Sequence, residues 1–190
     1  GFSLTYDGRS ANFTEKELEL TIAAAMGTRF ALRITPRAEL LQLALNLPVS
    51  QVTFTGDNLF DDYGADLETF IPQLKDAGKL ISFCLDPELA LLKRAYRLQA
   101  DMVELSVNHY SENSSVAGQA EAQEQIALMA RTAEKNGLGV AVNGGISFQN
   151  ALPLVSIEAV ENVVVGRAII GRSIFVGLET AVRDFKAQVQ

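Results

Sequence analysis

The sequence predicts an α/β fold in which parallel strands and helices alternate around a barrel. Two observations support this prediction. Short apolar runs rich in Val, Ile and Leu alternate with longer segments of helical periodicity, as expected for strands that are buried on both faces. The connections between them are short, and glycine closes several of them. Seven strands are expected, at about residues 2–6, 29–34, 51–55, 80–85, 102–107, 139–143 and 162–166.

The length of the chain fits one such domain covering residues 1–190. A complete TIM-type (β/α)8 barrel has eight strands and typically about 250 residues. This chain has 190 residues and a mass of 20.6 kDa, and it enters a strand directly after Gly1. We therefore expect a (β/α)8 barrel of which seven strands lie in the chain and the first strand is absent.

Charge and composition narrow the range of partners. The formal net charge is −7 and the pI is about 4.8, which disfavours binding to nucleic acid or to an anionic membrane surface. No apolar run is as long as a membrane span, and the single cysteine, Cys84, allows no disulfide within the chain. These features predict a cytoplasmic protein. Cys84 lies in an apolar strand, so it is interpreted as a small core residue, with a nucleophile as the alternative.

The helix ends are most easily recognised in the first half of the chain. Thr14 followed by Glu17 is a capping-box pattern, so a helix is expected from there to about Ala25. Pro36 begins the next helix and Pro48 ends it. Further helices are expected at about residues 67–77, 86–98, 117–135 and 172–188, with Asp86 as the N-cap of the second and Gly177 inside the fourth.

Two polar segments are interpreted as loops. Residues 57–66 contain four aspartates, and a solvated loop is the first interpretation. A divalent-metal site is the alternative, but the segment lacks histidine and the alternating spacing of a calcium loop. Residues 108–116 contain His109, the only histidine.

Two glycine turns near the C-terminus carry the strongest functional signal. Each follows an apolar strand, and they read Asn143-Gly144-Gly145 and Gly166-Arg167. In a parallel barrel, the last two turns commonly hold a phosphate group through backbone N–H groups and a helix N-terminus. Glycine allows the backbone to approach the anion, and Arg167 adds a positive charge. The alternative is that the glycines only form tight turns.

Several segments resemble the pyridoxine 5′-phosphate synthase family. Residues 164–182, VVGRAIIGRSIFVGLETAV, are similar to the family's final strand and helix, NIGHAIIGRAVFxGLxxAV. Residues 76–86, 103–110 and 137–150 match further family motifs. The resemblance implies a barrel that condenses 1-deoxyxylulose 5-phosphate with 3-amino-2-oxopropyl phosphate in vitamin B6 biosynthesis, without a metal or other cofactor. It also implies a homo-oligomer.

The chain departs from the family at positions that transfer protons. Where the family has strand histidines, this sequence has Thr5 and Ser106, and where it has a strand glutamate, this sequence has Arg33. The histidines of the two glycine turns are replaced by Gly144 and Arg167. Histidine and glutamate act as proton shuttles because their pKa values can lie near neutrality, whereas arginine stays cationic. These departures point away from the original reaction, so we expect a synthase-like barrel that binds a phosphorylated small metabolite, with a changed reaction on a phosphate ester as the alternative to the family reaction.

The remaining candidates each have two interpretations. Glu104, among apolar neighbours, is either an acid/base residue or one half of a structural ion pair. His109 is either catalytic or a plain loop residue. Arg33 either binds a ligand or pairs with Glu104, and Asn143 either binds a ligand or caps its turn. We expect Glu104 and His109 as the catalytic candidates, and Thr5, Arg33, Asn143, Gly144, Gly145, Gly166 and Arg167 as ligand-binding residues. A non-catalytic, regulatory phosphate-binding protein is the alternative function.

Overall fold

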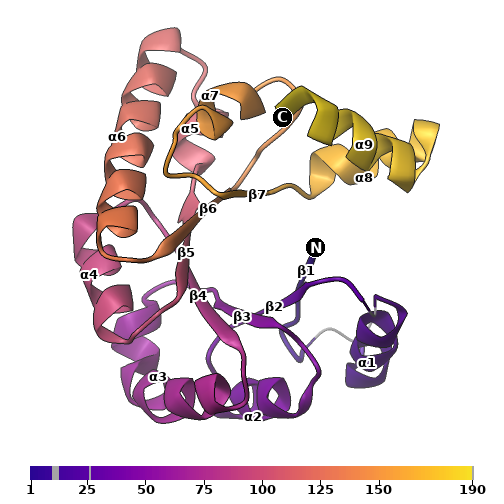
Figure 1. Ribbon diagram of the computed structural model, residues 1–190, viewed down its shortest axis with the longest axis vertical. Coiled ribbons are helices and arrows are strands. Elements are labelled where there is room, and N and C mark those ends of the chain that lie inside the picture. The colour runs from indigo at the N-terminus through magenta and orange to yellow at the C-terminus, as the bar shows by residue number, and fades with distance from the viewer. Residues whose placement is uncertain (10–12, 26, 190) are drawn as a thin grey trace. The chain divides into compact units, whose positions relative to one another are not determined.

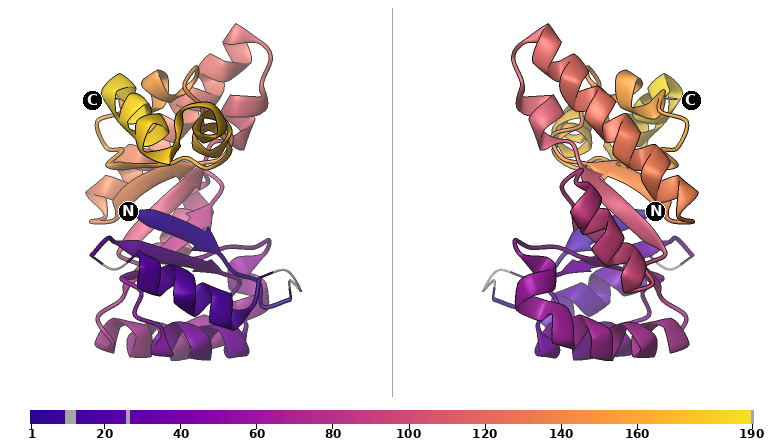
Figure 2. Two further views of the ribbon diagram at one scale, coloured as in Figure 1. Left: turned by 90° about the vertical axis from the view of Figure 1, so that its right-hand side faces the viewer. Right: turned by 90° about the vertical axis from the view of Figure 1, so that its left-hand side faces the viewer.

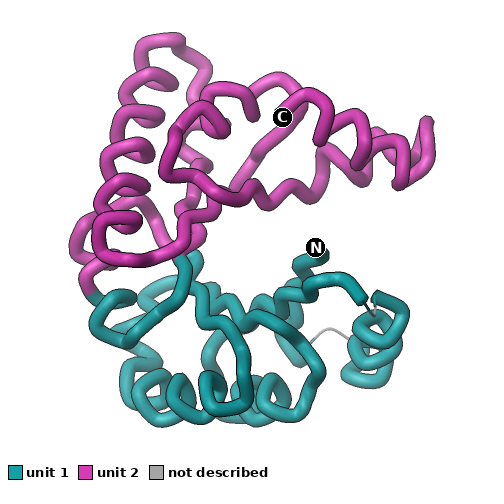
Figure 3. The backbone as a smooth tube through the Cα atoms, in the orientation of Figure 1, with its two compact units in different colours: residues 1–84, 94–102 teal, residues 85–93, 103–190 magenta. Residues whose placement is uncertain are grey.

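The computed structural model describes residues 1–9, 13–25 and 27–189. The chain divides into two compact units (Figure 3). Unit 1 contains residues 1–84 and 94–102, and unit 2 contains residues 85–93 and 103–190. The two units are described separately below.

Unit 1 contains four parallel strands in sequence order, joined by helices (Figure 1). Neighbouring strands pair in register, for example Thr5 with Arg33 and Arg33 with Thr53. Its elements are β1 (Phe2–Thr5), α1 (Glu15–Ala24), β2 (Phe30–Ile34), α2 (Ala38–Asn46), β3 (Gln51–Phe54), α3 (Leu59–Asp76) and β4 (Leu80–Leu85).

The core of unit 1 lies between one face of this sheet and helices α2 and α3, which run along that face (Figures 1 and 2). Alternate residues of β2, namely Phe30, Leu32 and Ile34, are buried there. Leu41 of α2 and Leu74 of α3 are buried as well. Burial of each such side chain stabilises the fold by about 1.5–3 kcal/mol. Because side chains alternate along a strand, the remaining strand residues point to the opposite face of the sheet, away from the helices.

Unit 2 repeats the same alternation. Its strands β5, β6 and β7 follow in sequence order, and β6 pairs with β7 in parallel. Its elements are α5 (Asn108–Glu112), α6 (Val116–Lys135), β6 (Gly139–Asn143), α7 (Ala151–Val155), β7 (Asn162–Val164), α8 (Arg167–Val176) and α9 (Leu178–Val189). Two further elements, α4 (Leu89–Arg97) and β5 (Met102–Ser106), contain residues of both units.

The predicted strands and the first helix agree with the structure. Each of the seven expected strands is present among the described residues. Thr14 caps α1, because its side chain accepts a hydrogen bond from the Glu17 N–H and the Glu17 carboxylate accepts one from the Thr14 N–H. No helix in the described ranges is both long and apolar enough to cross a bilayer.

The interpretation of residues 57–66 as a loop was wrong, because α3 begins at Leu59. Leu59 and Phe60 are buried, so packing rather than a side-chain cap begins this helix. Acidic residues in its first turn suit the positive end of the helix dipole, and Asp61 also pairs with Arg94 at 2.6 Å. Across the described part of the chain, no three His, Cys, Asp or Glu side chains gather closely enough to hold a metal ion.

Three other boundaries also differ from the sequence predictions. The polar segment 108–116 contains the short helix α5, and α4 begins at Leu89 rather than at Asp86. The single helix expected over residues 172–188 is two helices, since Gly177 adopts a φ of 81° and ends α8. Arg172 of α8 joins the two by donating a hydrogen bond from Nε to Asp184 Oδ2 of α9 at 2.8 Å.

Candidate functional site

The candidate site of unit 2 lies at the C-terminal ends of β6 and β7. Asn143 and Val164 are paired across these strands, so the two glycine turns that follow begin at the same edge of the sheet. This edge is where parallel α/β folds bind their ligands. The structure therefore brings together Asn143, Gly144, Gly145, Gly166 and Arg167.

The first turn packs against α5. Gly144 and Gly145 have φ angles of 106° and 64°, which favour glycine because a side chain is strained there. A Cβ at Gly144 would lie 2.5 Å from Asn108 Oδ1, and a Cβ at Gly145 would overlap the Ser111 side chain. Both glycines are thus needed for the turn itself.

A helix N-terminus, which the phosphate-binding pattern includes, does not follow the first turn directly. Residues 145–150 form a loop that Asn150 holds together, accepting a hydrogen bond from the Ser147 N–H and donating one to the Gly145 carbonyl. Helix α7 begins only at Ala151 and has 5 residues. The first turn therefore offers a loop backbone rather than a helix N-terminus.

The second turn leads directly into a helix, which begins before the expected start at about residue 172. Helix α8 begins at Arg167, directly after Gly166, and no side chain among the described residues caps it. The first N–H groups of a helix lack partners within the helix and carry a partial positive charge. A Cβ at Gly166 would meet no atom of the described residues within 4 Å, and its φ is −114°. The fold itself therefore does not require glycine here, and the space beside the helix N-terminus is open.

Glu104 and Asn143 meet beside the first turn. Glu104 on β5 is only 2% exposed. The Asn143 side-chain amide donates a hydrogen bond to the Glu104 carboxylate at 3.4 Å. A buried carboxylate is costly without such donors. Asn143, the last residue of β6, therefore stabilises the buried Glu104 side chain.

His109 lies on α5 and lines a pocket within unit 2. The pocket has a volume of about 270 Å³. Tyr110, next to His109, is buried and donates its hydroxyl to the Asn150 carbonyl at 3.1 Å. Burial raises the pKa of Tyr110. The sequence predictions did not include this pocket, which is lined by Asp86, Pro87, Glu88, Ser106, His109, Tyr110, Ala122, Gln125 and Ile126.

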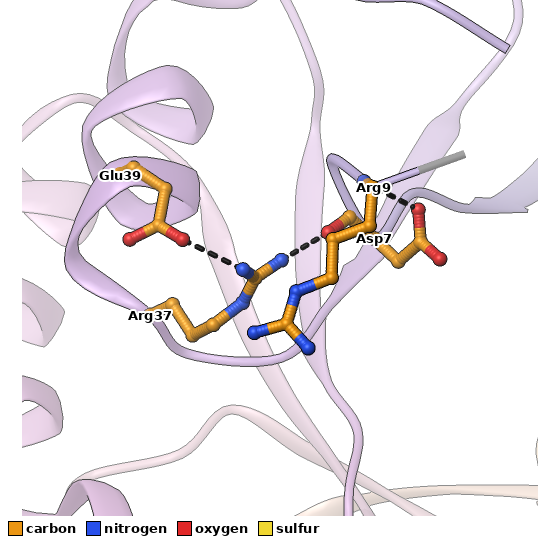
Figure 4. A network of polar contacts seen from close by, with 4 residues as sticks. All are labelled: Asp7, Arg9, Arg37 and Glu39. Carbon is orange, nitrogen blue, oxygen red and sulfur yellow. Dashed lines mark hydrogen bonds and ion pairs between the residues drawn. The ribbon is translucent and has the colours of Figure 1, made fainter. Parts of the chain in front are cut away.

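The other two predicted ligand-binding residues, Thr5 and Arg33, belong to unit 1. They are register partners on β1 and β2, so their side chains share one face of the sheet. The turn beyond β1 is fixed by Arg37 (Figure 4). Arg37 donates to the Asp7 carbonyl and pairs with Glu39 at 2.7 Å, while the Arg9 N–H donates to the Asp7 carboxylate at 2.9 Å.

Parallel strands alternating with helices, with two glycine turns after neighbouring strands, define a protein of the (β/α)-barrel class. Residues 14–190 match the family described as "Pyridoxal phosphate biosynthesis protein PdxJ". The chain belongs to this family.

Two relatives illustrate the relationship. Pyridoxine 5′-phosphate synthase of Syntrophobacter fumaroxidans is 31% identical over 172 residues, which cover 85% of this chain and 72% of the relative. The enzyme of the same name from Chlorobium phaeobacteroides is 32% identical over 176 residues, which cover 93% of this chain and 72% of the relative.

Solved structures agree with the fold class. The structure of KGPDC from Streptococcus mutans has a TM-score of 0.69 at 13% identity, covering 98% of this chain and 84% of the other. Thiamine phosphate pyrophosphorylase from Pyrococcus furiosus has a TM-score of 0.66 at 14% identity, covering 98% and 82%. The predicted TIM-type (β/α)-barrel class is thereby confirmed.

Proposed function

We propose that this chain is a pyridoxine 5′-phosphate synthase-like protein that binds a phosphorylated small metabolite at the ends of β6 and β7. The observation that carries the proposal is the second turn. There, the uncapped N-terminus of α8 faces open space at Gly166, a position where the fold itself does not require glycine. Membership of a family named for pyridoxal phosphate biosynthesis supports the same ligand class.

Each residue of the turn has a defined role in this proposal. The N–H groups of the first turn of α8 donate hydrogen bonds to the phosphate oxygens. Arg167, which is exposed, supplies the permanent positive charge. Gly166 allows the phosphate to reach the backbone. Asn143 ends β6 and contacts Glu104 on the neighbouring strand β5, so in this proposal the two residues can contact the rest of the metabolite.

The family reaction is the condensation of 1-deoxyxylulose 5-phosphate with 3-amino-2-oxopropyl phosphate, and it needs several proton transfers. At the positions that carry histidine in the family, this chain has Thr5, Ser106, Gly144 and Arg167. None of these side chains exchanges a proton readily near neutral pH. Glu104 and His109 remain as acid/base candidates.

A non-catalytic binding or regulatory protein is the second candidate function. The replacement of proton shuttles by Arg33 and Arg167 favours it, because arginine holds an anion without accepting its proton. An assay with both family substrates separates the two functions. Product formation that is abolished by Glu104→Gln supports a synthase, whereas tight binding without turnover supports a binding protein.

Thermal unfolding with a ligand panel tests the shared claim of phosphate binding. The panel contains pyridoxine 5′-phosphate, 1-deoxyxylulose 5-phosphate, unrelated sugar phosphates and inorganic phosphate. A ligand at 100 times its dissociation constant stabilises the folded state by about 2.7 kcal/mol, which raises Tm by roughly 5–10 °C for a chain of this size. No shift with any phosphate, in a folded sample, would contradict the proposal.

A further inference from the structure

A row of four polar side chains crosses the sheet of unit 1. Thr5 pairs with Arg33, Arg33 with Thr53, and Thr53 with Ser82 in successive strands. Residues paired in register on parallel strands point to the same face of a sheet. The four side chains therefore form one continuous line, named here the polar row, on strands β1 to β4.

The polar row lies on the face opposite the apolar core. The residues that alternate with it, such as Leu32, Val52 and Ile81, are fully buried toward the helices. The face that carries the polar row corresponds to the interior of a barrel, which is normally filled by branched apolar side chains. Three hydroxyl groups and one guanidinium group in this layer are therefore unusual for a purely structural role.

The Ser82 hydroxyl indicates that a hydrogen-bonding ligand is missing from this row. Its side chain is 0% exposed, and its hydroxyl oxygen has no hydrogen-bond partner among the described residues. A buried hydroxyl without a partner loses its hydration and gains nothing in exchange. Its register partner Thr53 is also 0% exposed, but Thr53 accepts a hydrogen bond from Gln51 Nε2 at 3.0 Å. The Ser82 hydroxyl is therefore unfavourable in this environment unless a ligand supplies its partner.

Arg33 gives the polar row its charge. It is half-buried, two strands away from Ser82 in the same row. Its planar guanidinium carries five N–H donors in a geometry that matches a carboxylate or phosphate group. Neighbouring hydroxyl groups add donors of the kind that oxyanions accept.

We propose that the polar row binds an oxyanion, a carboxylate or phosphate group, with Arg33 providing the charge and the Ser82 hydroxyl donating a hydrogen bond. The site consists of residues of unit 1 only, whereas the glycine turns belong to unit 2. The proposal therefore does not rest on the phosphate site at α8. If both sites exist, the chain binds anionic groups at two separate sites.

Nuclear magnetic resonance of the full chain tests this site directly. The Arg33 Nε–H signal is assigned by its disappearance in Arg33→Lys. Inorganic phosphate and malonate are then titrated separately into the wild type, and at least one of them is expected to shift this signal saturably. A shift with phosphate alone or with malonate alone defines the group that the site accepts. Absence of a saturable shift with both anions would overturn the proposal.

Variants distinguish binding from a structural role. Ser82→Ala is expected to weaken binding of the anion that shifts the Arg33 Nε–H signal by at least about tenfold, because a hydrogen bond to a charged group is lost. Its Tm without ligand should be equal to or higher than that of the wild type. Ser3→Ala, on the same face of β1 but outside the polar row, is the matched control and should change neither value.

A further variant separates this site from the one at α8. Arg167→Ala should leave the Arg33 shift unchanged, because Arg167 lies outside the polar row. If Ser82→Ala binds the anion as tightly as the wild type, or if Arg167→Ala abolishes the Arg33 shift, the assignment to the polar row is wrong. Failure of phosphate to bind at α8 would leave the Arg33 result unaffected.

Discussion

The Asn143 side-chain amide donates a hydrogen bond to the Glu104 carboxylate at 3.4 Å, joining β6 to β5 at the edge of the candidate site. Glu104 is 2% exposed, so each donor to its carboxylate matters for the stability of the fold. The pair connects the first glycine turn to the only carboxylate of β5 and fixes the position of both groups.

Loss of this donor should destabilise the protein. We expect Asn143→Ala to lower the free energy of unfolding by about 1–3 kcal/mol, because a buried carboxylate loses a partner. Urea unfolding measures this value. In a double-mutant cycle with Glu104→Gln, the two effects should be coupled by about 0.5–3 kcal/mol. Asn162→Ala, at an exposed position of β7, is the control. Additive effects in the cycle would show that the contact contributes no coupling energy.

The glycines of the two turns should respond differently to alanine. Gly145→Ala forces a Cβ onto Ser111 at a φ of 64° and is expected to lose about 1–3 kcal/mol of stability. Gly166→Ala meets open space and is expected to stay within about 0.5 kcal/mol of the wild type or to become slightly more stable. Thermal denaturation compares the two. Equal losses at both positions would contradict the geometry of the second turn.

Tyr110 should make stability depend on pH in the alkaline range. Burial raises the pKa of its hydroxyl above the ordinary value of 10.0. The unfolded state therefore ionises first and binds fewer protons, so the contribution of Tyr110 is fully present below pH 10 and is lost as pH rises through the folded pKa. Lys79 makes stability rise with pH instead, because burial lowers its pKa and the folded state releases the proton first.

The comparison of wild type with Tyr110→Phe isolates this effect, since both contain Lys79. Urea unfolding between about pH 9 and 11.5 should show a shallower loss of stability with rising pH in Tyr110→Phe. The variant also loses the hydrogen bond to the Asn150 carbonyl, which lowers its stability equally at all pH values below 10. Parallel curves across the whole range would exclude a raised pKa of Tyr110.

The capping box of α1 makes a local prediction. Thr14→Ala should lower stability by about 1 kcal/mol, because the first turn loses its side-chain cap. Hydrogen bonds from the Thr14 backbone and side chain lower the pKa of Glu17. The contribution of Glu17 to folding stability is therefore present above the ordinary pKa of 4.5 and is lost as pH falls through the pKa of the folded state.

The cap can be checked by carboxyl titration with nuclear magnetic resonance. In Thr14→Ala the pKa of Glu17 should rise part of the way toward its ordinary value, because the side-chain hydrogen bond is lost while the backbone N–H of residue 14 still donates. Glu19→Gln, an exposed change in the same helix, should leave it unchanged. An unaltered titration of Glu17 in Thr14→Ala would refute the contribution assigned to the Thr14 side chain.

Self-association is a further expectation. We propose that the chain forms homo-oligomers, and α8 offers a contact surface because Ile174 and Phe175 are 78% and 87% exposed. Exposed apolar side chains that lie together commonly mark interaction surfaces. Sedimentation should detect a species larger than 20.6 kDa, and Phe175→Ser should shift the distribution toward the monomer. A monodisperse wild-type monomer would contradict this expectation.

The sequence predicted the fold well because its signals are local. Strand–helix alternation and the capping box of Thr14 need only neighbouring residues to be recognised. The start of α3 was missed because Asn58 precedes the helix in a left-handed conformation with a φ of 49° and gives no side-chain cap. Gly177 was placed inside a helix because the apolar pattern continues on both sides of it.

The candidate site was predicted only in part. The glycine turns are visible as motifs, but their different geometry depends on α5, which packs against Gly144 and Gly145, whereas a Cβ at Gly166 would meet no described atom within 4 Å. The contact of Asn143 with Glu104 depends on the placement of two strands that are far apart in the sequence. Likewise, Ser82 joins Arg33 only through the strand register, which periodicity alone does not provide.

Phosphate binding at the N-terminus of α8 is the central claim, and calorimetric titration of pyridoxine 5′-phosphate into the wild type and Gly166→Ala tests it most directly. We expect saturable binding to the wild type and at least about tenfold weaker binding to Gly166→Ala, which is about 1.4 kcal/mol, with the Tm of the unliganded proteins unchanged. Equal affinities, or no binding of this or any other phosphate ester to the folded wild type, would contradict the claim.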